Sequence, residues 1–223
     1  DSMKHFVWTP GVIYADRVIL QSEKMKQIYV NEFIKAATKA GMPNDYRHRQ
    51  KLEMKFQGSG SPKLDKVQNA KVENIEIPKE WLQIIQKKDG SWKKIILYNT
   101  SITSLLENEE KMLTKIEDVF QIFYENRDEV TLLWRPHPLI KETIRAMRPM
   151  LWVEYERIVE KYRKEKWGIY DESANLNRAI ALCNGYYGDR SSVVRLCQEL
   201  KKPIMLQNVN VLERLEVKVG KVH

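Results

Sequence analysis

Apolar and polar positions change period regularly along the second half of the chain. Apolar runs predict buried strands at KKIILYN (93–99), VTLLW (130–134), WGIYD (167–171), GYYGD (185–189) and KPIMLQ (202–207). Between these runs, apolar residues recur at helical spacing and predict helices over about 107–124, 140–166, 175–183 and 192–200, with Pro149 interrupting the second. Alternating strands and helices predict an α/β fold, a Rossmann-like doubly wound parallel sheet.

The first 66 residues have a less regular pattern, typical of the tail of another α/β domain. FVWTPGV (6–12) and DRVILQS (16–22) are strand candidates, and Ser22 can cap a helix that runs to a stop at Gly41. GMPNDYRHRQ (41–50) predicts a loop. KLEMKFQGSGSPKLDKV (51–67) begins with strand-like alternation and ends in a glycine turn. Residues 67–92 are polar and predict a linker with one short helix near 80–86, which leaves 93–223 as the second domain.

Composition limits the class of protein and of partner. Hydrophobic residues make up 43% and charged residues 30%, an ordinary globular balance, and no apolar run is long enough to span a bilayer. The net charge of +8 favours an anionic partner, although a basic surface without a partner is the alternative. The start lacks a signal-peptide pattern and an initiator Met, which suggests a segment of a longer protein. Cys183 and Cys197 are expected to be buried free thiols in a reducing cytoplasm.

Polar side chains follow each predicted strand of the second domain. They are Asn99, Thr100 and Ser101; Arg135, His137 and Pro138; Asp171, Glu172 and Ser173; and Asp189, Arg190, Ser191 and Ser192. In doubly wound sheets, ligands bind beyond the carboxyl ends of the strands, beside helix N-termini. Hydroxyl groups, two arginines and a histidine at this edge are groups that bind phosphate.

Three of these stretches admit two interpretations each. In GDRSS (188–192) the serines either cap a helix or, with its N-terminus, hold an anion. In WRPHP (134–138) two prolines flank His137, which either binds phosphate and moves protons or is a solvated loop residue. In YDES (170–173) Asp171 either binds ribose or polyol hydroxyls or caps the next helix, a role that suits Ser173 better. The glycine-rich turn GSGSPKLDKV (58–67) matches no nucleotide motif and is more typical of a tight loop.

Taken in order, several segments resemble the CDP-glycerol glycerophosphotransferases, the teichoic acid polymerase family. They are ADRVILQSEKMKQIY followed by GSGSPKLDKV, then LLWRPHP, then YDESANLNRAIALCNGYYGDRSSVVRLCQELKKPIM. The resemblance covers most of residues 11–66 and 93–207, and it implies a two-domain architecture of the glycosyltransferase-B type. The chain departs from the family pattern in two places. No carboxylate follows Ser192 before Glu199, and NTSIT (99–103) lacks an arginine.

The resemblance implies roles for the polar strand ends. His137, Ser191 and Ser192 would hold the pyrophosphate of a CDP-activated donor, with Thr100 and Ser101 close to it. Asp189 would orient the serine turn, and Arg135, Asp171 and Arg190 are further candidates for orienting the donor. The catalytic base is unassigned, because the front half of the family's acceptor domain has no counterpart in this sequence.

We therefore expect the donor-binding part of a transferase for cell-wall polymer synthesis, a glycerophosphotransferase or glycosyltransferase, inactive as this segment alone. It would need no cofactor and no metal, and would lie in the cytoplasm or at the inner face of the membrane. Its partners would be a nucleotide-activated donor, an anionic membrane surface and a lipid-linked acceptor. The alternative is a non-catalytic docking module with the same fold. Nucleic-acid binding through Trp152, Tyr155, Tyr162 and Trp167 is disfavoured, because their spacing is that of packed helix residues.

Overall fold

The chain forms two compact units, which are described separately. A computed structural model describes residues 4–42, 45–70 and 72–211. The first unit comprises Asp1–Lys66 and the second Val67–His223.

A five-stranded parallel sheet is the centre of the second unit. Its strands are β3 (Lys94–Thr100), β4 (Val130–Pro136), β5 (Ile169–Tyr170), β6 (Gly185–Gly188) and β7 (Ile204–Leu206). They lie in the order β5-β4-β3-β6-β7, and every neighbouring pair is parallel. The predicted α/β class and the parallel sheet are confirmed, and the arrangement is consistent with a Rossmann-like fold.

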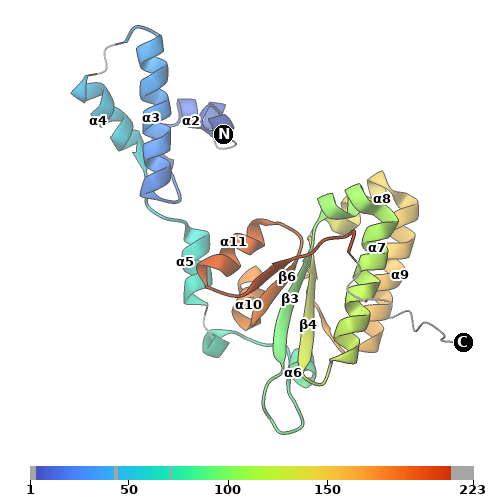
Figure 1. Ribbon diagram of the computed structural model, residues 1–223. Helices are drawn as coiled ribbons and strands as arrows, with labels where there is room; N and C mark the ends of the chain where they lie inside the picture. Colours follow the sequence, from blue (N-terminus) through green and yellow to red (C-terminus); the bar gives the residue numbers. More distant parts are fainter. Residues whose placement is uncertain (1–3, 43–44, 71, 212–223) are drawn as a thin grey trace, which may run out of the picture. The chain divides into compact units, whose positions relative to one another are not determined.

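Helices cover both faces of this sheet. In Figure 1, α7 (Ile102–Glu125), α8 (Ile140–Met147) and α9 (Pro149–Glu165) lie on one side, and α10 (Leu176–Leu182) and α11 (Ser192–Glu199) lie on the other. The predicted interruption at Pro149 is confirmed. Pro149 opens α9, where its missing N–H would have had no helical partner.

Aromatic rings fill the layer between the sheet and α7 and α9. Phe120 packs against Trp134 and Tyr162, with ring centroids 4.8 and 4.3 Å apart, and Trp134 also lies 5.9 Å from Tyr155. Trp134, Tyr155 and Tyr162 are all at most 1% exposed. The aromatic helix residues considered as a stacking platform for bases are therefore mostly core residues.

The segment that precedes the sheet is more helical than a linker. It contains the end of α5 (Pro62–Asn69), a 3-10 turn η1 (Val72–Asn74) and α6 (Lys79–Ile85). The helix predicted near residues 80–86 is confirmed as α6, whose Trp81 and Ile85 are buried.

The first unit holds a small parallel sheet, in which β1 (Val18–Ile19) pairs with β2 (Phe56–Gln57), and α3 (Glu23–Lys39). The strand at DRVILQS is confirmed in part as β1. The cap is also confirmed, because the Ser22 hydroxyl accepts a hydrogen bond from the Met25 N–H at 3.2 Å.

Two other predictions for the first unit are wrong. FVWTPGV is not a strand but belongs to α1 (Lys4–Val7) and α2 (Pro10–Tyr14), because Pro10 takes the favoured first position of α2. The loop and alternating stretch at 46–55 form α4 (Tyr46–Lys55), because the Asp45 carboxylate accepts from the His48 N–H at 2.7 Å and caps that helix.

Candidate functional site

The turns that follow β3, β4 and β6 lie at the same end of the sheet in the second unit. The backbone N–H of His137, after β4, donates to the Thr100 carbonyl at 3.0 Å. The N–H of Asp189, after β6, donates to the Asn99 carbonyl at 2.9 Å. The carboxyl ends of β3, β4 and β6 therefore converge, as the sequence predicted for a ligand-binding edge.

Asp189 connects these turns through its carboxylate. Its two oxygens accept hydrogen bonds from the Ser101 backbone N–H at 2.6 Å and from the Gln207 side-chain amide. Its own backbone carbonyl accepts from the Tyr186 hydroxyl, whose pKa is raised above its usual value mainly by burial, so that the hydroxyl remains a donor. Asp189 is 7% exposed. The side chain therefore joins the ends of β3, β6 and β7.

Ser191 has the capping role that was one of its two predicted roles. Its hydroxyl oxygen accepts from the Val193 N–H at 3.2 Å and caps α11, and the same hydroxyl donates to the Asn99 side-chain carbonyl at 2.9 Å. The Asn99 amide in turn donates to the Arg135 carbonyl at 2.8 Å. This hydroxyl is thus committed to protein partners on both sides.

Gly188 permits a close approach, but to protein backbone. Its φ is +137°, and a Cβ at this position would lie 2.2 Å from the Asn99 carbonyl oxygen. Only glycine fits, because the backbones of β6 and β3 meet there.

Thr100 and Ser101 are engaged within the fold as well. The Thr100 hydroxyl accepts from the Trp134 indole N–H at 3.1 Å and is 1% exposed. The Ser101 hydroxyl caps α7 by accepting from the Ser104 N–H at 3.1 Å. Both residues lie at the predicted edge of the sheet, and both hydroxyls are used in hydrogen bonds within the protein.

Arg135 and Asp171 form a buried ion pair on the α10 side of the sheet. Arg135 also donates to the Ser173 carbonyl at 2.6 Å, and the Ser173 N–H donates to Asp171 at 3.1 Å. Sequence reasoning missed Arg178, which lies 3.7 Å from the Asp171 carboxylate and 4.3 Å over the Trp81 ring. The available signal was a single charged residue in the first turn of a mostly apolar helix.

Three predicted site residues remain exposed at this edge: His137, Arg190 and Ser192. The His137 Nδ1 accepts from the Leu139 N–H at 3.2 Å, which places the proton of the neutral ring on the outer Nε2. Ser192 is the first residue of α11. All three side chains offer N–H or O–H donors, and Arg190 and Ser192 lie at the N-terminus of α11, which carries partial positive charge. We name His137, Arg190 and Ser192 the donor rim, after the hydrogen-bond donors that their side chains carry.

A cavity of about 300 Å³ lies next to His137. Its walls include Trp152, Tyr155 and Tyr170, four glutamates (Glu142, Glu156, Glu160 and Glu172), and the cations Lys141 and Arg163. Partial burial raises the pKa of Tyr170 to about 12. The Tyr155 hydroxyl is buried near Thr100 without a well-formed hydrogen bond, and burial raises its pKa. Carboxylates and hydroxyls suit a hydroxyl-bearing group better than a phosphate.

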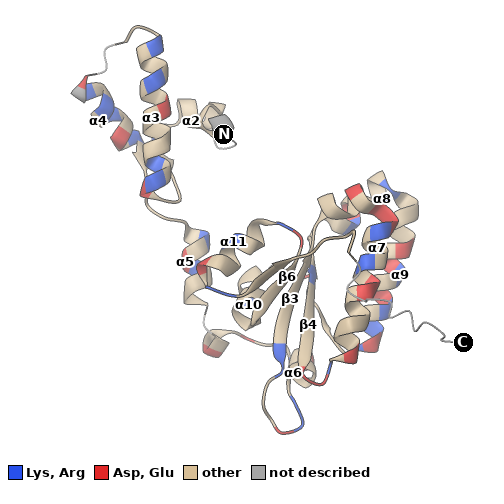
Figure 2. Ribbon diagram, in the orientation of Figure 1, with Lys and Arg blue, Asp and Glu red and all other residues tan. Residues whose placement is uncertain are grey.

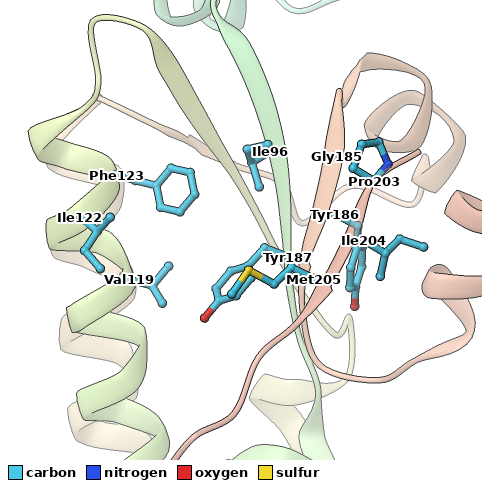
Figure 3. Close-up of a pocket in the computed structure, with 10 residues that line it drawn as sticks. All are labelled: Ile96, Val119, Ile122, Phe123, Gly185, Tyr186, Tyr187, Pro203, Ile204 and Met205. Carbon is cyan, nitrogen blue, oxygen red and sulfur yellow. The ribbon is translucent and has the colours of Figure 1, made fainter. Parts of the chain in front are cut away.

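The larger cavity, about 360 Å³, lies elsewhere. Figure 3 shows Val119, Ile122 and Phe123 of α7 facing Ile96 of β3 and the β6 and β7 residues across an apolar space. None of the predicted site residues lines it. It offers no donor set for a diphosphate.

Charged residues of both signs are mixed on two helices of the second unit, whereas one helix of the first unit is mostly basic. In Figure 2, basic and acidic residues are mixed on α7 and α9, where Arg157 pairs with Glu117 at 3.3 Å. In α4 of the first unit, Arg47, Arg49, Lys51 and Lys55 accompany a single acidic residue.

Among the described residues, no three His, Cys, Asp or Glu side chains gather as a metal site. No described helix combines the length and apolarity that a membrane crossing needs.

Comparisons of the chain with family models, with curated proteins and with solved structures found no match.

Proposed function

We propose that the second unit binds the donor of a transferase that uses a nucleotide-diphosphate-activated alcohol or sugar. The supporting observation is the convergence of three strand ends, which leaves the donor rim exposed at one edge of the sheet, with Arg190 and Ser192 at the start of α11. The ordered resemblance to CDP-glycerol glycerophosphotransferases adds the donor class and the link to cell-wall polymer synthesis.

In this proposal the predicted phosphate ligands divide into two groups. The His137 Nε2–H, the Ser192 hydroxyl and the Arg190 guanidinium contact the diphosphate and stabilise the charge that leaves with the nucleotide. Ser191, Thr100, Ser101 and Asp189 are positioning residues, since their hydrogen bonds to protein groups hold the three turns. The cavity beside His137 has room for a hydroxyl-bearing part of the donor.

The acceptor side of the proposal rests on charge. The basic residues of α4 favour an anionic membrane leaflet, where a lipid-linked acceptor would be presented at the cytoplasmic side. The proposal assigns no residue as the catalytic base that would deprotonate the acceptor.

Titration of the chain with CDP-glycerol, measured by calorimetry, tests the donor site. Replacing either Ser192 or His137 with alanine should weaken binding at least about tenfold, because a hydrogen bond to a charged group contributes roughly 1.5–3 kcal/mol. Ser59→Ala and His48→Ala, in the first unit, are the matched controls and should bind like the unmodified chain. Equal binding by all four variants would rule out the donor rim as the diphosphate site.

A non-catalytic docking module is the second candidate. It is favoured by the internal use of the Ser191, Thr100 and Ser101 hydroxyls. Arg195, in place of the family's acidic residue, also favours it. Absence of binding to CDP-glycerol, to a UDP-sugar and to CDP alone would select this candidate over the transferase.

A further inference from the structure

The side of the central sheet that faces α7 is covered only in part. Tyr98 of β3, Tyr187 of β6 and Met205 of β7 are register partners in one row on this side. Their exposed fractions rise along the row from 0% through 7% to 58%. The cover that α7 gives this face therefore ends at β6 and leaves β7, the edge strand of the described sheet, open.

The open part of this face forms the apolar cavity of about 360 Å³. Val119, Ile122 and Phe123 of α7 form one of its walls, and Tyr187 and Met205 lie across from them (Figure 3). The described residues that line it include no charged side chain. Water inside such a space lacks hydrogen-bond partners, so apolar side chains that fill it stabilise the fold.

The chain that follows β7 turns toward this cavity. Val209 packs against the core cluster that lies between the sheet and α7. The Val211 carbonyl accepts a hydrogen bond at 2.6 Å from the ammonium group of Lys115, a fully buried residue of α7. Along α7, Val119 and Phe123 lie about 6 and 12 Å beyond Lys115. Val211, the last described residue, is therefore held close to the cavity wall.

The next residues of the chain carry an apolar pattern that fits this wall. Residues 212–223, LERLEVKVGKVH, lie outside the described part of the chain. Leu212, Leu215, Val219 and Val222 recur at spacings of three and four, the pattern of one face of a helix, and charged residues separate them. Eleven residues span about 16 Å as a helix, which is enough to pass the whole wall.

We propose that residues 212–222 dock in this cavity and place their apolar side chains between α7 and β7. The occupant is this segment because Lys115 already holds Val211 beside the opening. Docking of a tethered segment does not lose the translational and rotational freedom that a separate molecule loses on binding. The segment thus supplies the cover that β7 lacks among the described residues.

Docking on β7 would also stabilise one end of the candidate site. Gln207, which follows β7, donates from its amide to the Asp189 carboxylate and accepts from the Tyr98 hydroxyl at 3.0 Å. Because Asp189 joins the strand ends, a segment packed on β7 holds the turns without contacting a donor. The proposal does not depend on the donor, and its test uses none.

The test is oxidation of the folded full chain by hydrogen peroxide, with the rate at each methionine measured by peptide mass spectrometry. Met205 and Met147 are a matched pair, since they are 58% and 53% exposed and Met205 alone of the two lines the cavity. Methionine oxidation follows exposure. Met205 should react at least about tenfold more slowly than Met147, because burial of a single leucine or valine favours the docked state by more than that factor.

Substitutions in the segment test whether it provides the protection. Val219→Asp places a charge within the apolar pattern and should raise the Met205 rate toward that of Met147. Val217→Asp, at a position outside the pattern, is the matched control and should leave Met205 protected. A chain that ends at Val211 should lose the protection as Val219→Asp does, so the result does not depend on one substitution.

Three results would overturn the proposal. The first is equal oxidation rates at Met205 and Met147 in the unmodified chain, which needs no variant and decides the question even if Val219→Asp unfolds. The second is protection of Met205 that persists in the chain that ends at Val211. The third is protection that disappears on dilution, which would identify a second copy of the chain as the occupant.

Discussion

The two faces of the central sheet use the same strands for different purposes. Along β3 and β4, Tyr98 and Trp134 are register partners and face the aromatic layer under α7 and α9. The next pair, Asn99 and Arg135, faces α10 and α11 and enters hydrogen bonds and an ion pair. Neighbouring residues on each strand point to opposite faces, so one packs against aromatic rings and the next joins a polar network.

The two faces of the sheet therefore stabilise different parts of the structure. The aromatic face holds the helices against the sheet, and the polar face holds the turns at its edge. Apolar packing is non-directional and fixes how far the helices lie from the sheet, whereas hydrogen bonds fix the direction of each turn. On the polar face, Asp189, Ser191 and Asn99 all have protein partners for their side chains, whereas Ser192 and His137 lie at the surface. The first three residues should therefore govern stability, and the exposed pair should govern ligand affinity.

Gly188→Ala should damage the polar face most. The added Cβ would lie 2.2 Å from the Asn99 carbonyl oxygen, at a φ of +137°. Overpacking and backbone strain each cost about 1–3 kcal/mol, and backbone atoms cannot turn aside, so we expect a loss of roughly 4–6 kcal/mol in urea denaturation.

Gly90→Ala is the control, since Gly90 also has a positive φ, of +84°, but nothing within 4 Å of a new Cβ. It should cost only about 1 kcal/mol. Equal losses in the two variants would mean that strain alone, and not the contact between β6 and β3, makes Gly188 necessary.

Asp171→Ala should be the next most damaging change. It leaves the Arg135 guanidinium, which is 6% exposed, without its buried counter-charge. Removing one partner of a buried pair typically costs about 3–5 kcal/mol. The double variant Asp171→Ala with Arg135→Leu should recover part of this loss in the same denaturation experiment. If it recovered nothing, the loss would not come from the unpaired charge of Arg135.

Alkaline pH should act most strongly on the aromatic face, although the buried Tyr186 hydroxyl gives the polar face a smaller share of the same effect. Burial raises the pKa of Tyr98, Tyr155 and Tyr162 well above 10, the value expected in the unfolded chain. The folded state therefore keeps protons that the unfolded state loses, so the stability is complete below pH 10 and declines above it. Three such groups should remove about 2.5 kcal/mol of unfolding free energy at about pH 10.5.

Denaturation at several pH values, with tyrosinate absorbance as a second signal, measures this decline. Tyrosinate absorbance that rises before unfolding, with no loss of stability, would show that these hydroxyls reach solvent in the folded state.

The sequence predicted the sheet better than the contacts at its edge. Apolar runs such as KKIILYN identify a strand because burial on both faces requires them, and Pro149 marks a helix start by its own chemistry. The same local signals failed at residues 46–55, where the apolar alternation is compatible with helix and the Asp45 cap decides. Local pattern is informative only where one conformation satisfies it.

The partners of the site residues could not be predicted, because they lie far away in sequence. The Ser191 hydroxyl meets Asn99, and the Ser101 N–H meets Asp189. Such contacts depend on strand order, which periodicity does not encode. The sequence therefore identified the edge of the sheet, while the division into buried and exposed residues required coordinates.

The adjacent serines give the smallest effects and the sharpest contrast. Ser191→Ala removes the α11 cap and a partner of Asn99, and should cost about 1–2 kcal/mol. Ser192→Ala removes an exposed hydroxyl and should change stability by less than about 0.5 kcal/mol. Ser22→Ala, which removes the equivalent cap of α3, calibrates the cost of a lost cap at about 1 kcal/mol. If Ser192→Ala proved as destabilising as Ser191→Ala, Ser192 would belong to the network that holds the turn, and the exposed half of the edge would be reduced to His137 and Arg190.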